Sequence, residues 1–499
     1  MAKSKITKVV IAGGGSAGWM AAAALSKQLG KIIDIVLVES DEIATIGVGE
    51  ATIPPIRVFH KLLGIDEQEF MRATSATFKL GIAFENWGDI GEKYVHSFGR
   101  TGKESYLADF QHFWLRGLKE GVNADFGDYC YELQAAKSGK FATSAQSKIN
   151  YAYHLDATAY AKFLRGFSEK LGVKRIEGKI VDVIKSTPSG MIESLTLDSG
   201  QVIAGDLFID CTGFRGLLIE QALHTGYEDW SHWLPCDSAV AVQTKTTANP
   251  LPYTRSIAHC AGWRWKIPLQ HRVGNGLVFC SQYMSDDEAK KILLESVEGE
   301  VLTQPKVLKF RTGRRRKMWN KNCVALGLSS GFVEPLESTS IHLIITGLVR
   351  LIRLFPFSGM QRSLINEYNE QARIELEKIR DFIILHYHVT SRDDSPFWTY
   401  CKTMDVPDTL LHRINLFKES AQAFQLDGEL FRVDSWTQVM IGQGILPLNY
   451  HRIVDTMKDT ELKQFLNSFK SSITNAVEKL PTHQEFINQY CSIELANTD

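Results

Sequence analysis

The feature that most restricts the fold of this chain is a glycine-rich turn near its start. The turn, Gly13–Gly18, has glycines at its first, third and sixth positions and lies between an apolar run at 6–12 and an alanine-rich stretch at 19–29. A second apolar run at 33–38 then ends at Glu39. This order of strand, turn, helix and strand, closed by an acid about 20 residues after the turn, is typical of a Rossmann-type unit that binds a dinucleotide.

Each glycine of the turn has a physical reason. Gly13 permits the tight turn, Gly15 lets the backbone approach a pyrophosphate, and Gly18 lets the helix pack closely on the strand. Glu39 is expected to accept hydrogen bonds from ribose hydroxyls. NAD and FAD both fit this pattern, and a purely structural glycine turn is the remaining alternative. Since no second Gly-x-Gly-x-x-Gly follows, a chain that held FAD would receive reduced flavin from a separate reductase.

Charge and cysteine content argue against several functional classes. The formal net charge is −1, so no whole-molecule field favours nucleic acid or an acidic membrane surface. The eight cysteines form no Cys-x-x-Cys pair, and no metal site is expected. Isolated cysteines fit a reducing cytoplasm, and the first residues show no signal-peptide pattern. The apolar segment 341–355 contains Arg350 and Arg353, which makes it too charged to span a bilayer.

The rest of the chain reads as a second, antiparallel sheet followed by helices. Residues 181–203 predict a strand hairpin, and 207–210 predict a buried strand that leads into Cys211-Thr212-Gly213. Short β-like runs dominate 238–283, and the chain after about Pro356 is mainly helical. No linker rich in proline, serine or glycine separates these regions, so we expect interleaved modules in one compact unit.

Five further stretches resemble one known family. They are 47–54 (Gly-Val-Gly-Glu-Ala-Thr-Ile-Pro), 77–82 (Thr-Phe-Lys-Leu-Gly-Ile), 210–213 (Asp-Cys-Thr-Gly), 263–268 (Trp-Arg-Trp-Lys-Ile-Pro) and 331–339 (Gly-Phe-Val-Glu-Pro-Leu-Glu-Ser-Thr). In this order they resemble the flavin-dependent tryptophan halogenase family, over most of the chain up to about residue 400. The Trp-x-Trp-x-Ile-Pro box and the Glu-Pro-Leu-Glu-Ser-Thr run are far more specific than the glycine turn.

The resemblance implies a fold and a chemistry. The fold would be α/β: a Rossmann-type FAD-binding fold similar to flavin monooxygenases, with an antiparallel substrate sheet and a mainly helical C-terminal part. Residues 1–355 would form the FAD-binding module interleaved with substrate-sheet segments, and 356–499 a helical module packed on the same unit. FADH2 and oxygen would oxidise chloride or bromide to hypohalous acid, which travels through a tunnel to a lysine and then halogenates an electron-rich aromatic ring.

The catalytic and halide-binding roles of the family fall on four residues of this sequence. Lys79 matches the essential lysine; a solvated surface lysine is the alternative. Glu337 matches the assisting glutamate, and an acid at a helix start is its alternative. Thr339 and Ser340 match the halide-binding backbone positions. The family often has glycine at the second of these, so Ser340 is a departure that affects the size of the halide pocket.

The remaining roles of the family fall on residues beside the flavin and around the substrate. Trp263 and Trp265 match a tryptophan pair that keeps substrate away from the flavin, and aromatic core filling is their alternative. Pro268 and Ser338 are expected on the same flavin side, and His96, Phe98 and Trp436 on the substrate side. The residues expected to hold FAD are Gly13, Gly15, Ser16, Ala17, Gly18, Glu39, Gly49, Glu50, Ala51, Asp210 and Gly213.

One departure from the family bears on the substrate. Members that act on free tryptophan clamp its amino-acid part with two adjacent tyrosines, and this sequence contains no Tyr-Tyr pair. We therefore expect indole or another electron-rich aromatic in place of free tryptophan. The runner-up function is an FAD-dependent aromatic hydroxylase, and a flavin-binding protein without turnover is a third hypothesis. The family often forms dimers, so a homodimer is also expected.

Overall fold

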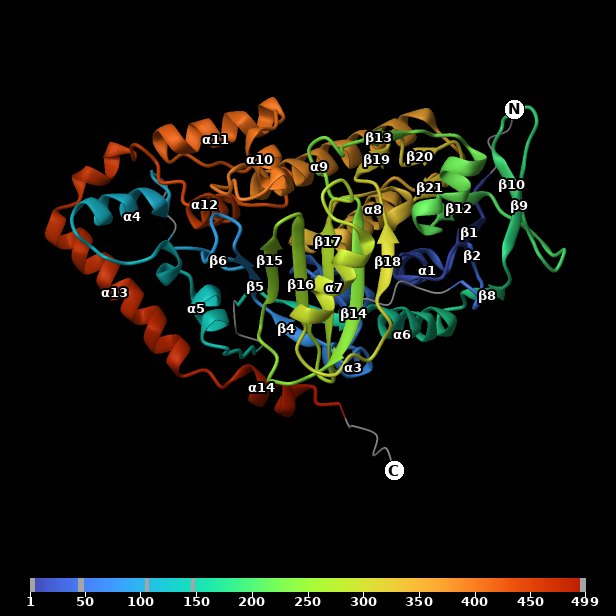
Figure 1. Ribbon diagram of the computed structural model, residues 1–499. Helices are drawn as coiled ribbons and strands as arrows, with labels where there is room; N and C mark the ends of the chain where they lie inside the picture. The colour runs from blue at the N-terminus through green and yellow to red at the C-terminus, as the bar shows by residue number, and fades with distance from the viewer. Residues whose placement is uncertain (1–4, 44–48, 104–106, 145–148, 494–499) are drawn as a thin grey trace. The chain divides into compact units, whose positions relative to one another are not determined.

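The structure is a computed structural model that describes residues 5–43, 49–103, 107–144 and 149–493. The chain forms two compact units, and both are discontinuous in sequence. The first unit comprises Met1–Ala76, Leu155–Pro235 and Phe310–Leu376, and the second comprises Thr77–His154, Cys236–Lys309 and Glu377–Asp499. Helix α9 (Arg362–His388), which is labelled in Figure 1, contributes residues to both units, since the division falls between Leu376 and Glu377.

The first unit is built on a six-stranded sheet with the order β20-β21-β12-β1-β2-β8. All neighbouring pairs are parallel except β20 with β21. The strands are β1 (Lys8–Ala12), β2 (Asp34–Glu39), β8 (Lys174–Glu177), β12 (Leu207–Asp210), β20 (Trp319–Asn320) and β21 (Cys323–Ala325). Because β1, β2, β12 and β21 carry continuous apolar runs, the sheet is buried on both faces, as parallel sheets usually are. The predicted Rossmann-type unit is confirmed.

Helices and smaller sheets complete the first unit. Helices α6 and α8 pack against α1, which follows the glycine turn. The helices are α1 (Ser16–Leu29), α2 (Pro55–Leu63), α3 (Glu67–Ala73), α6 (Ala157–Lys170) and α8 (Ser340–Arg353), with short helical turns at Gly213–Arg215, Leu217–Ala222, Gly327–Ser329 and Pro335–Glu337. The other strands are β3 (Gly49–Ala51), β9 (Ile180–Lys185), β10 (Ile192–Leu197), β11 (Val202–Ala204), β13 (Tyr227–Asp229), β19 (Gly313–Arg315) and β22 (Gly331–Phe332).

The second unit is built on a seven-stranded sheet with the order β18-β14-β17-β16-β15-β5-β6. Only the β15–β5 pair is parallel, so the predicted antiparallel sheet is confirmed. Its strands are β5 (Gly81–Glu85), β6 (Lys93–Ser97), β14 (Ser238–Lys245), β15 (Thr254–His259), β16 (Gly262–Pro268), β17 (Arg272–Phe279) and β18 (Lys306–Lys309). Separately, β4 (Thr77–Lys79) pairs antiparallel with β7 (Ala152–Asp156).

Helices predominate in the last part of the second unit, as expected for the chain after about Pro356. They are α10 (Pro396–Thr403), α11 (Asp408–Ser420), α12 (Val433–Gly442), α13 (Asp459–Glu478) and α14 (His483–Tyr490), joined by a short turn at Arg452–Thr456. Earlier segments supply α4 (Phe110–Lys119), α5 (Tyr131–Lys137), α7 (Asp286–Ser296) and a turn at Phe126–Tyr129. Figure 1 shows the long helix α13 beside α4 and α5, which it contacts.

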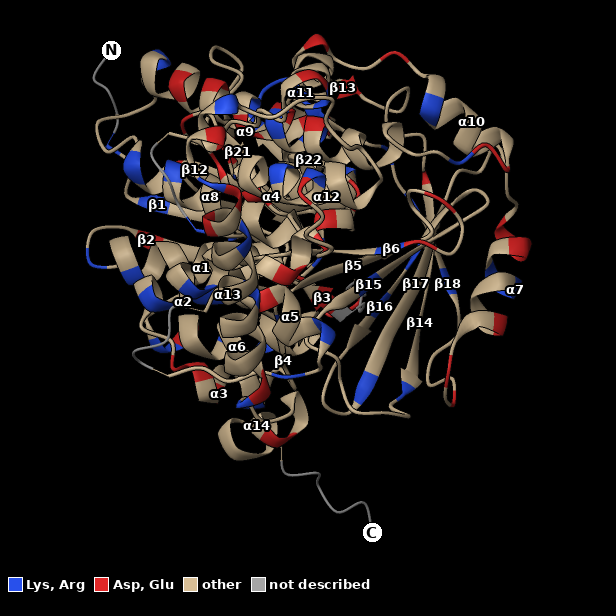
Figure 2. Cartoon of the chain, turned by 90° about the vertical axis from the view of Figure 1, so that its left-hand side faces the viewer, with Lys and Arg blue, Asp and Glu red and all other residues tan. Residues whose placement is uncertain are grey.

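Basic and acidic residues are interspersed along the helices (Figure 2), in keeping with the net charge of −1. Across the described segments, no helix is long and apolar enough to cross a membrane.

Candidate active site

The glycine turn of the first unit has the geometry of a phosphate cradle. Gly13 has a φ of 104°, and a Cβ there would overlap the carbonyl oxygen of Cys211 at the end of β12. A Cβ on Gly18 would overlap the carbonyl of Gly13, so these two glycines are required by close backbone packing. At Gly15, in contrast, no described atom lies within 4 Å of an added Cβ. Open space therefore lies beside the N-terminus of α1, where Ser16 and Ala17 form the first turn.

Glu39 stands at the edge of this cradle. Its carboxylate lies against Gly14, where a Cβ would overlap it, and it accepts a hydrogen bond of 2.6 Å from Nε of Arg175. Arg175 belongs to β8, the parallel neighbour of β2. The ion pair, with both side chains 14% exposed, holds the carboxylate at the end of β2 and directs it toward the turn. This placement suits a group that accepts hydrogen bonds from a ribose.

Asp210 organises the neighbouring strand end. One of its carboxylate oxygens accepts from the backbone N–H and the hydroxyl of Thr212, at 2.9 and 2.7 Å. The other accepts from the backbone N–H groups of Leu218 and Ile219, both at 2.8 Å. With four protein donors on its two oxygens, Asp210 shapes the turn that carries Gly213, whose φ is 71°.

A further motif expected near the cofactor is only partly described. Gly47 and Val48 lie outside the described residues, whereas Gly49, Glu50 and Ala51 form β3. Desolvation raises the pKa of Glu50 to about 7, so this carboxyl group is poised to gain or lose a proton near neutral pH.

The Glu-Ser-Thr-Ser run forms a sharp turn at the start of a helix. Glu337 is 1% exposed, and Ser338 has a left-handed backbone with a φ of 58°. Thr339 caps α8, which begins at Ser340. The Thr339 hydroxyl is fully buried and has no hydrogen-bond partner among the described residues. Free N–H groups of a helix N-terminus and an orphaned hydroxyl together suit a small anion.

In the second unit, Lys79 is buried. It ends strand β4 and its exposure is 0%, so it is not the solvated surface lysine that was its alternative. Its ammonium nitrogen lies 5.3 Å from the centroid of the Phe98 ring. The backbone N–H of Phe98 donates to the carbonyl of Leu80 at 2.9 Å, which holds Phe98 next to the residue that follows Lys79. The structure thus brings together the predicted catalytic lysine and a predicted substrate-side ring.

His96 and Trp436 share a neighbour in the same unit. The centroid of the Phe382 ring lies 5.5 Å from that of His96 and 4.9 Å from that of Trp436. The guanidinium of Arg413 lies 4.3 Å from the Trp436 ring. The indole Nε1 of Trp436 is buried and has no partner in the described part of the chain. His96 and Trp436 therefore lie in an aromatic cluster around Phe382, while Phe98 lies beside Lys79.

The tryptophan box occupies strand β16. Trp263 and Trp265 are both buried and their ring centroids are 6.1 Å apart, on the same face of the strand. Trp265 lies directly opposite Gly276 of β17, and a Cβ on Gly276 would overlap the six-membered ring of Trp265. Pro268 ends the strand, and its carbonyl accepts a hydrogen bond of 2.7 Å from the Thr77 hydroxyl.

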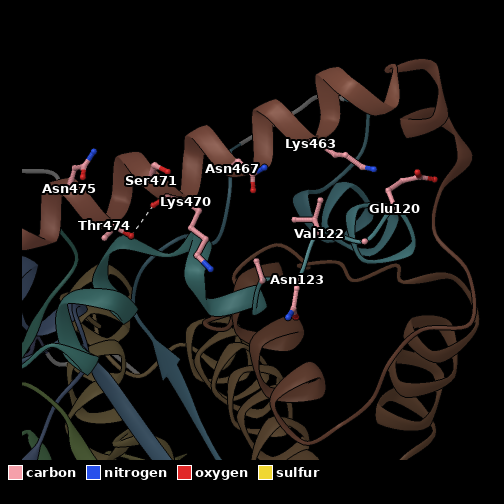
Figure 3. Close-up of a pocket in the computed structure, with 11 residues that line it drawn as sticks. Glu120, Val122, Asn123, Lys463, Asn467, Lys470, Ser471, Thr474 and Asn475 are labelled. Atoms are coloured by element: carbon pink, nitrogen blue, oxygen red, sulfur yellow. Dashed lines mark hydrogen bonds between the residues drawn. The ribbon is translucent and has the colours of Figure 1, made fainter.

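A cavity of about 560 Å³ lies elsewhere in the second unit. Figure 3 shows Asn467 and Lys470 of α13 on one side, with Val122 and Asn123 on the other. Its described lining is mainly polar and contains no aromatic side chain and none of the predicted site residues. This cavity is therefore a poor receptor for an aromatic ring.

The sequence matches known proteins along almost its entire length. The profile of the tryptophan halogenase family matches residues 8–459. The chain belongs to this family. Tryptophan 7-halogenase RebH from Lentzea aerocolonigenes is 36% identical, over 97% of this chain and 99% of that protein.

Solved structures of halogenases agree with the family assignment. Xcc4156, a flavin-dependent halogenase from Xanthomonas campestris, superposes with a TM-score of 0.97 at 55% identity, over 98% of this chain and 99% of that one. BrvH, a flavin-dependent halogenase from Brevundimonas sp. BAL3, has a TM-score of 0.94 at 43% identity, over 98% and 100%. This member of the tryptophan halogenase family is accordingly a flavin-dependent halogenase, an enzyme that uses FAD and a halide to halogenate an aromatic substrate.

The first unit of the halogenase fits its cofactor. The open space at Gly15, the N-terminus of α1 and the carboxylate of Glu39 suit the pyrophosphate and a ribose of FAD. When bound, reduced FAD would supply the activation of molecular oxygen, and the activated oxygen would oxidise the halide.

One contributor to this halogenase site carries no signal in the sequence. Arg175, which holds Glu39, is 136 residues away from it along the chain, and local patterns do not predict a contact between strands so far apart. Gly276, which makes room for Trp265, does carry a signal, because a glycine inside a strand pattern marks a close approach.

Proposed function

We propose that Lys79 presents hypohalous acid to an electron-rich aromatic ring. The observation that carries this proposal is the burial of Lys79 beside Phe98, at 0% exposure and 5.3 Å from the ring centroid. A lysine shielded from water donates strongly to a hypohalite oxygen, or reacts as an amine once deprotonated. The adjacent ring of Phe98 offers a surface on which an indole can stack.

We propose indole or a substituted indole as the substrate, in preference to free tryptophan. The absence of a Tyr-Tyr pair from the sequence supports this choice, because the amino-acid clamp of the tryptophan-specific members is missing. A second observation also supports it: the rings of His96, Phe382 and Trp436 form an aromatic cluster. These rings favour a flat apolar substrate, and the unpartnered Nε1 of Trp436 offers one donor to it.

We further propose supporting roles for residues of the first unit. Glu337 would assist as a carboxylate that polarises the hypohalous acid or accepts the ring proton, and its burial supports such a role. The backbone at Thr339 and Ser340 would bind the halide, supported by the helix start and the buried Thr339 hydroxyl. Asp210 would act on the cofactor through the Gly213 turn.

In the second unit, Trp263 and Trp265 would keep the substrate from the flavin, and their exposure of 2% and 8% supports a fixed placement.

We also propose a separate flavin reductase as the source of FADH2, because only one dinucleotide motif occurs. A cytoplasmic location is supported by the scattered spacing of the eight cysteines, which form no Cys-x-x-Cys pair. A homodimer and the division of the chain at residue 355 remain predictions.

Mass spectrometry of reaction products tests the function directly. The enzyme is supplied with FAD, a flavin reductase, NADH, oxygen, bromide and a panel led by indole and tryptophan. We expect indole to be brominated at a higher rate than tryptophan, with the product detected by its bromine isotope doublet. In Lys79→Met the doublet should be lost while FAD remains bound. Lys93→Met is the matched control, because Lys93 also faces a ring, that of Tyr253 at 5.6 Å, but is 47% exposed.

Three outcomes would contradict these assignments. An oxygen-addition mass in place of the bromine doublet would indicate a hydroxylase. Tryptophan turned over much faster than indole would refute the proposed substrate class. Bromination that survives Lys79→Met would remove the catalytic role from this lysine.

A further inference from the structure

A buried histidine joins the strand of Lys79 to the strands around the tryptophan box. His154 of β7 is 0% exposed. Its Nδ1 lies 3.0 Å from the hydroxyl of Thr77, and its Nε2 lies 3.0 Å from the hydroxyl of Thr254 at the start of β15. Thr77 begins β4, two residues before Lys79, and its hydroxyl also contacts the carbonyl of Pro268 at 2.7 Å. One imidazole therefore links three strands.

The direction of every hydrogen bond in this chain of groups follows from chemistry. The Pro268 carbonyl can only accept, so the single hydroxyl proton of Thr77 is donated to it. The Thr77 oxygen must then accept from His154, which places a proton on Nδ1. In a neutral imidazole Nε2 is consequently the acceptor, and it takes the hydroxyl proton of Thr254. The order is Thr254 to His154 to Thr77 to Pro268, with one proton for each bond.

The surroundings keep this imidazole neutral. Burial, and then the charge of Lys79, hold the pKa of His154 well below its ordinary value. A protonated imidazole would place a second positive charge beside Lys79, away from water. The neutral tautomer required by the hydrogen bonds is thus also the form that the electrostatics favour.

Lys79 is held by its neighbours in sequence as well as by its own contacts. The backbone N–H of Phe78 donates to Nε2 of His483 at 3.1 Å, and that ring donates from Nδ1 to the carbonyl of Pro250 at 2.8 Å. The backbone N–H of Leu80 donates to the carbonyl of Pro252 at 2.7 Å. The chain is therefore anchored at 77, 78 and 80, and Thr77 shares with Lys79 the face of β4 on which His154 lies.

We propose that His154 is a positioning residue that fixes Lys79 for halogenation through its Nδ1–H bond to Thr77. This inference rests on the proposed role of Lys79. The mechanism needs no proton transfer by His154: its neutral ring ties β4 to β15 through Thr77 and Thr254. If that bond is lost, the ammonium of Lys79 is displaced from the position in which it holds hypohalous acid, and the acid escapes into solvent.

Two substitutions at position 154 separate this role from simple packing. In His154→Asn the side-chain amide N–H takes the place of Nδ1 and can still donate to Thr77. In His154→Gln the amide extends toward Thr254 and the bond to Thr77 is lost. Both replacements are uncharged, so neither adds a charge beside Lys79. Thr77→Val and Thr254→Val form a second matched pair, because each removes one hydroxyl with little change of shape.

The assay uses the whole FAD-loaded enzyme with a flavin reductase, bromide and indole. It measures kcat and KM for indole bromination, and the hypobromous acid trapped in solution by a thioether. We expect His154→Gln and Thr77→Val to lower kcat by about 10- to 100-fold, because displacement of a catalytic group by about 1 Å has effects of this size. KM should stay unchanged and the trapped acid should rise. His154→Asn should retain at least about tenfold more activity than His154→Gln, and Thr254→Val more than Thr77→Val.

Hydrogen exchange of the 77–80 segment in the FAD-free protein provides a readout that is independent of catalysis. We expect faster exchange in His154→Gln than in His154→Asn. Equal exchange in the two variants, or an equal kcat for them, would overturn the inference. If His154→Gln does not fold, a folded Thr77→Val with wild-type kcat would overturn it equally. A wild type that brominates nothing would instead refute the proposed function, and the exchange rates would still decide the role of His154.

Discussion

Replacement of Gly276 by alanine tests how the second unit holds Trp265. The two residues are directly opposed across β16 and β17, and the added Cβ would overlap three atoms of the six-membered ring of Trp265. Trp265 is 8% exposed, so its ring has little free space in which to move. Overpacking of this kind costs about 1–3 kcal/mol of unfolding free energy.

The sign of the effect should reverse when the indole is removed. In a Trp265→Ala background the overlap is absent, and alanine in a strand interior is more stable than glycine by about 0.5–1 kcal/mol. The effect of Gly276→Ala should therefore differ between the two backgrounds by at least about 1.5 kcal/mol, which is the smaller loss added to the smaller gain.

Urea unfolding of the wild type, the two single variants and the double variant, followed by circular dichroism, measures this difference. Gly166→Ala is the matched control, since Gly166 lies in α6 and no described atom comes within 4 Å of its added Cβ. It should stabilise the protein by up to about 1 kcal/mol. If Gly276→Ala destabilises both backgrounds equally, the packing of Trp265 is not the reason for this glycine.

Three further predictions follow from the structure. Gly18→Ala should destabilise the FAD-free protein, because its Cβ overlaps the carbonyl of Gly13. Gly15→Ala should leave the stability of the FAD-free protein unchanged but weaken FAD binding, as measured by flavin fluorescence. Glu429→Gln should lower the free energy of unfolding in urea by about 3–5 kcal/mol, because it leaves the buried guanidinium of Arg413 without a charged partner. In the wild type this guanidinium donates to both carboxylate oxygens of Glu429, at 2.7 and 2.9 Å. A loss below about 1 kcal/mol would contradict this. Burial lowers the pKa of His60 from 6.5 to about 3, so the unfolded chain binds more protons between these values. Stability should accordingly fall as the pH decreases from 7 to 4, by up to about 1.4 kcal/mol per pH unit for this histidine, and an unchanged urea midpoint at pH 5 would be evidence against it.

Local patterns were sufficient to predict β1, β2 and β12 of the first sheet and the run from β14 to β17 of the second. They did not predict the other strands of these sheets, which are β5, β6, β8, β18, β20 and β21. The strand, glycine turn and helix at the start were predictable, because each glycine is needed either for its own backbone conformation or for the close packing of the next element. The hairpin that includes β9 and β10 and the antiparallel run from β14 to β17 also followed from alternation and turn residues. Where a contact is made within one supersecondary unit, sequence spacing carries the information.

The surroundings of the candidate catalytic lysine could not be predicted in the same way. Lys79 was assigned by resemblance, and only the structure shows that it is buried beside Phe98. His154 was not singled out, since its two partners lie 77 and 100 residues away and no spacing rule connects them. The division at residue 355 stays a prediction, while the structure assigns α8 to the first unit and α9 to both.

By itself, the sequence determined the Rossmann-type start, the second sheet, the single dinucleotide motif and, through rare motifs, the family. These features depend on neighbours within a few residues, or on residue types that only one chemistry requires. The tertiary structure decided that Lys79 is buried beside Phe98, that His154 bonds to the strand of Lys79, and that Arg175 holds Glu39. These depend on strand register, and register is set by the packing of segments far apart in the chain.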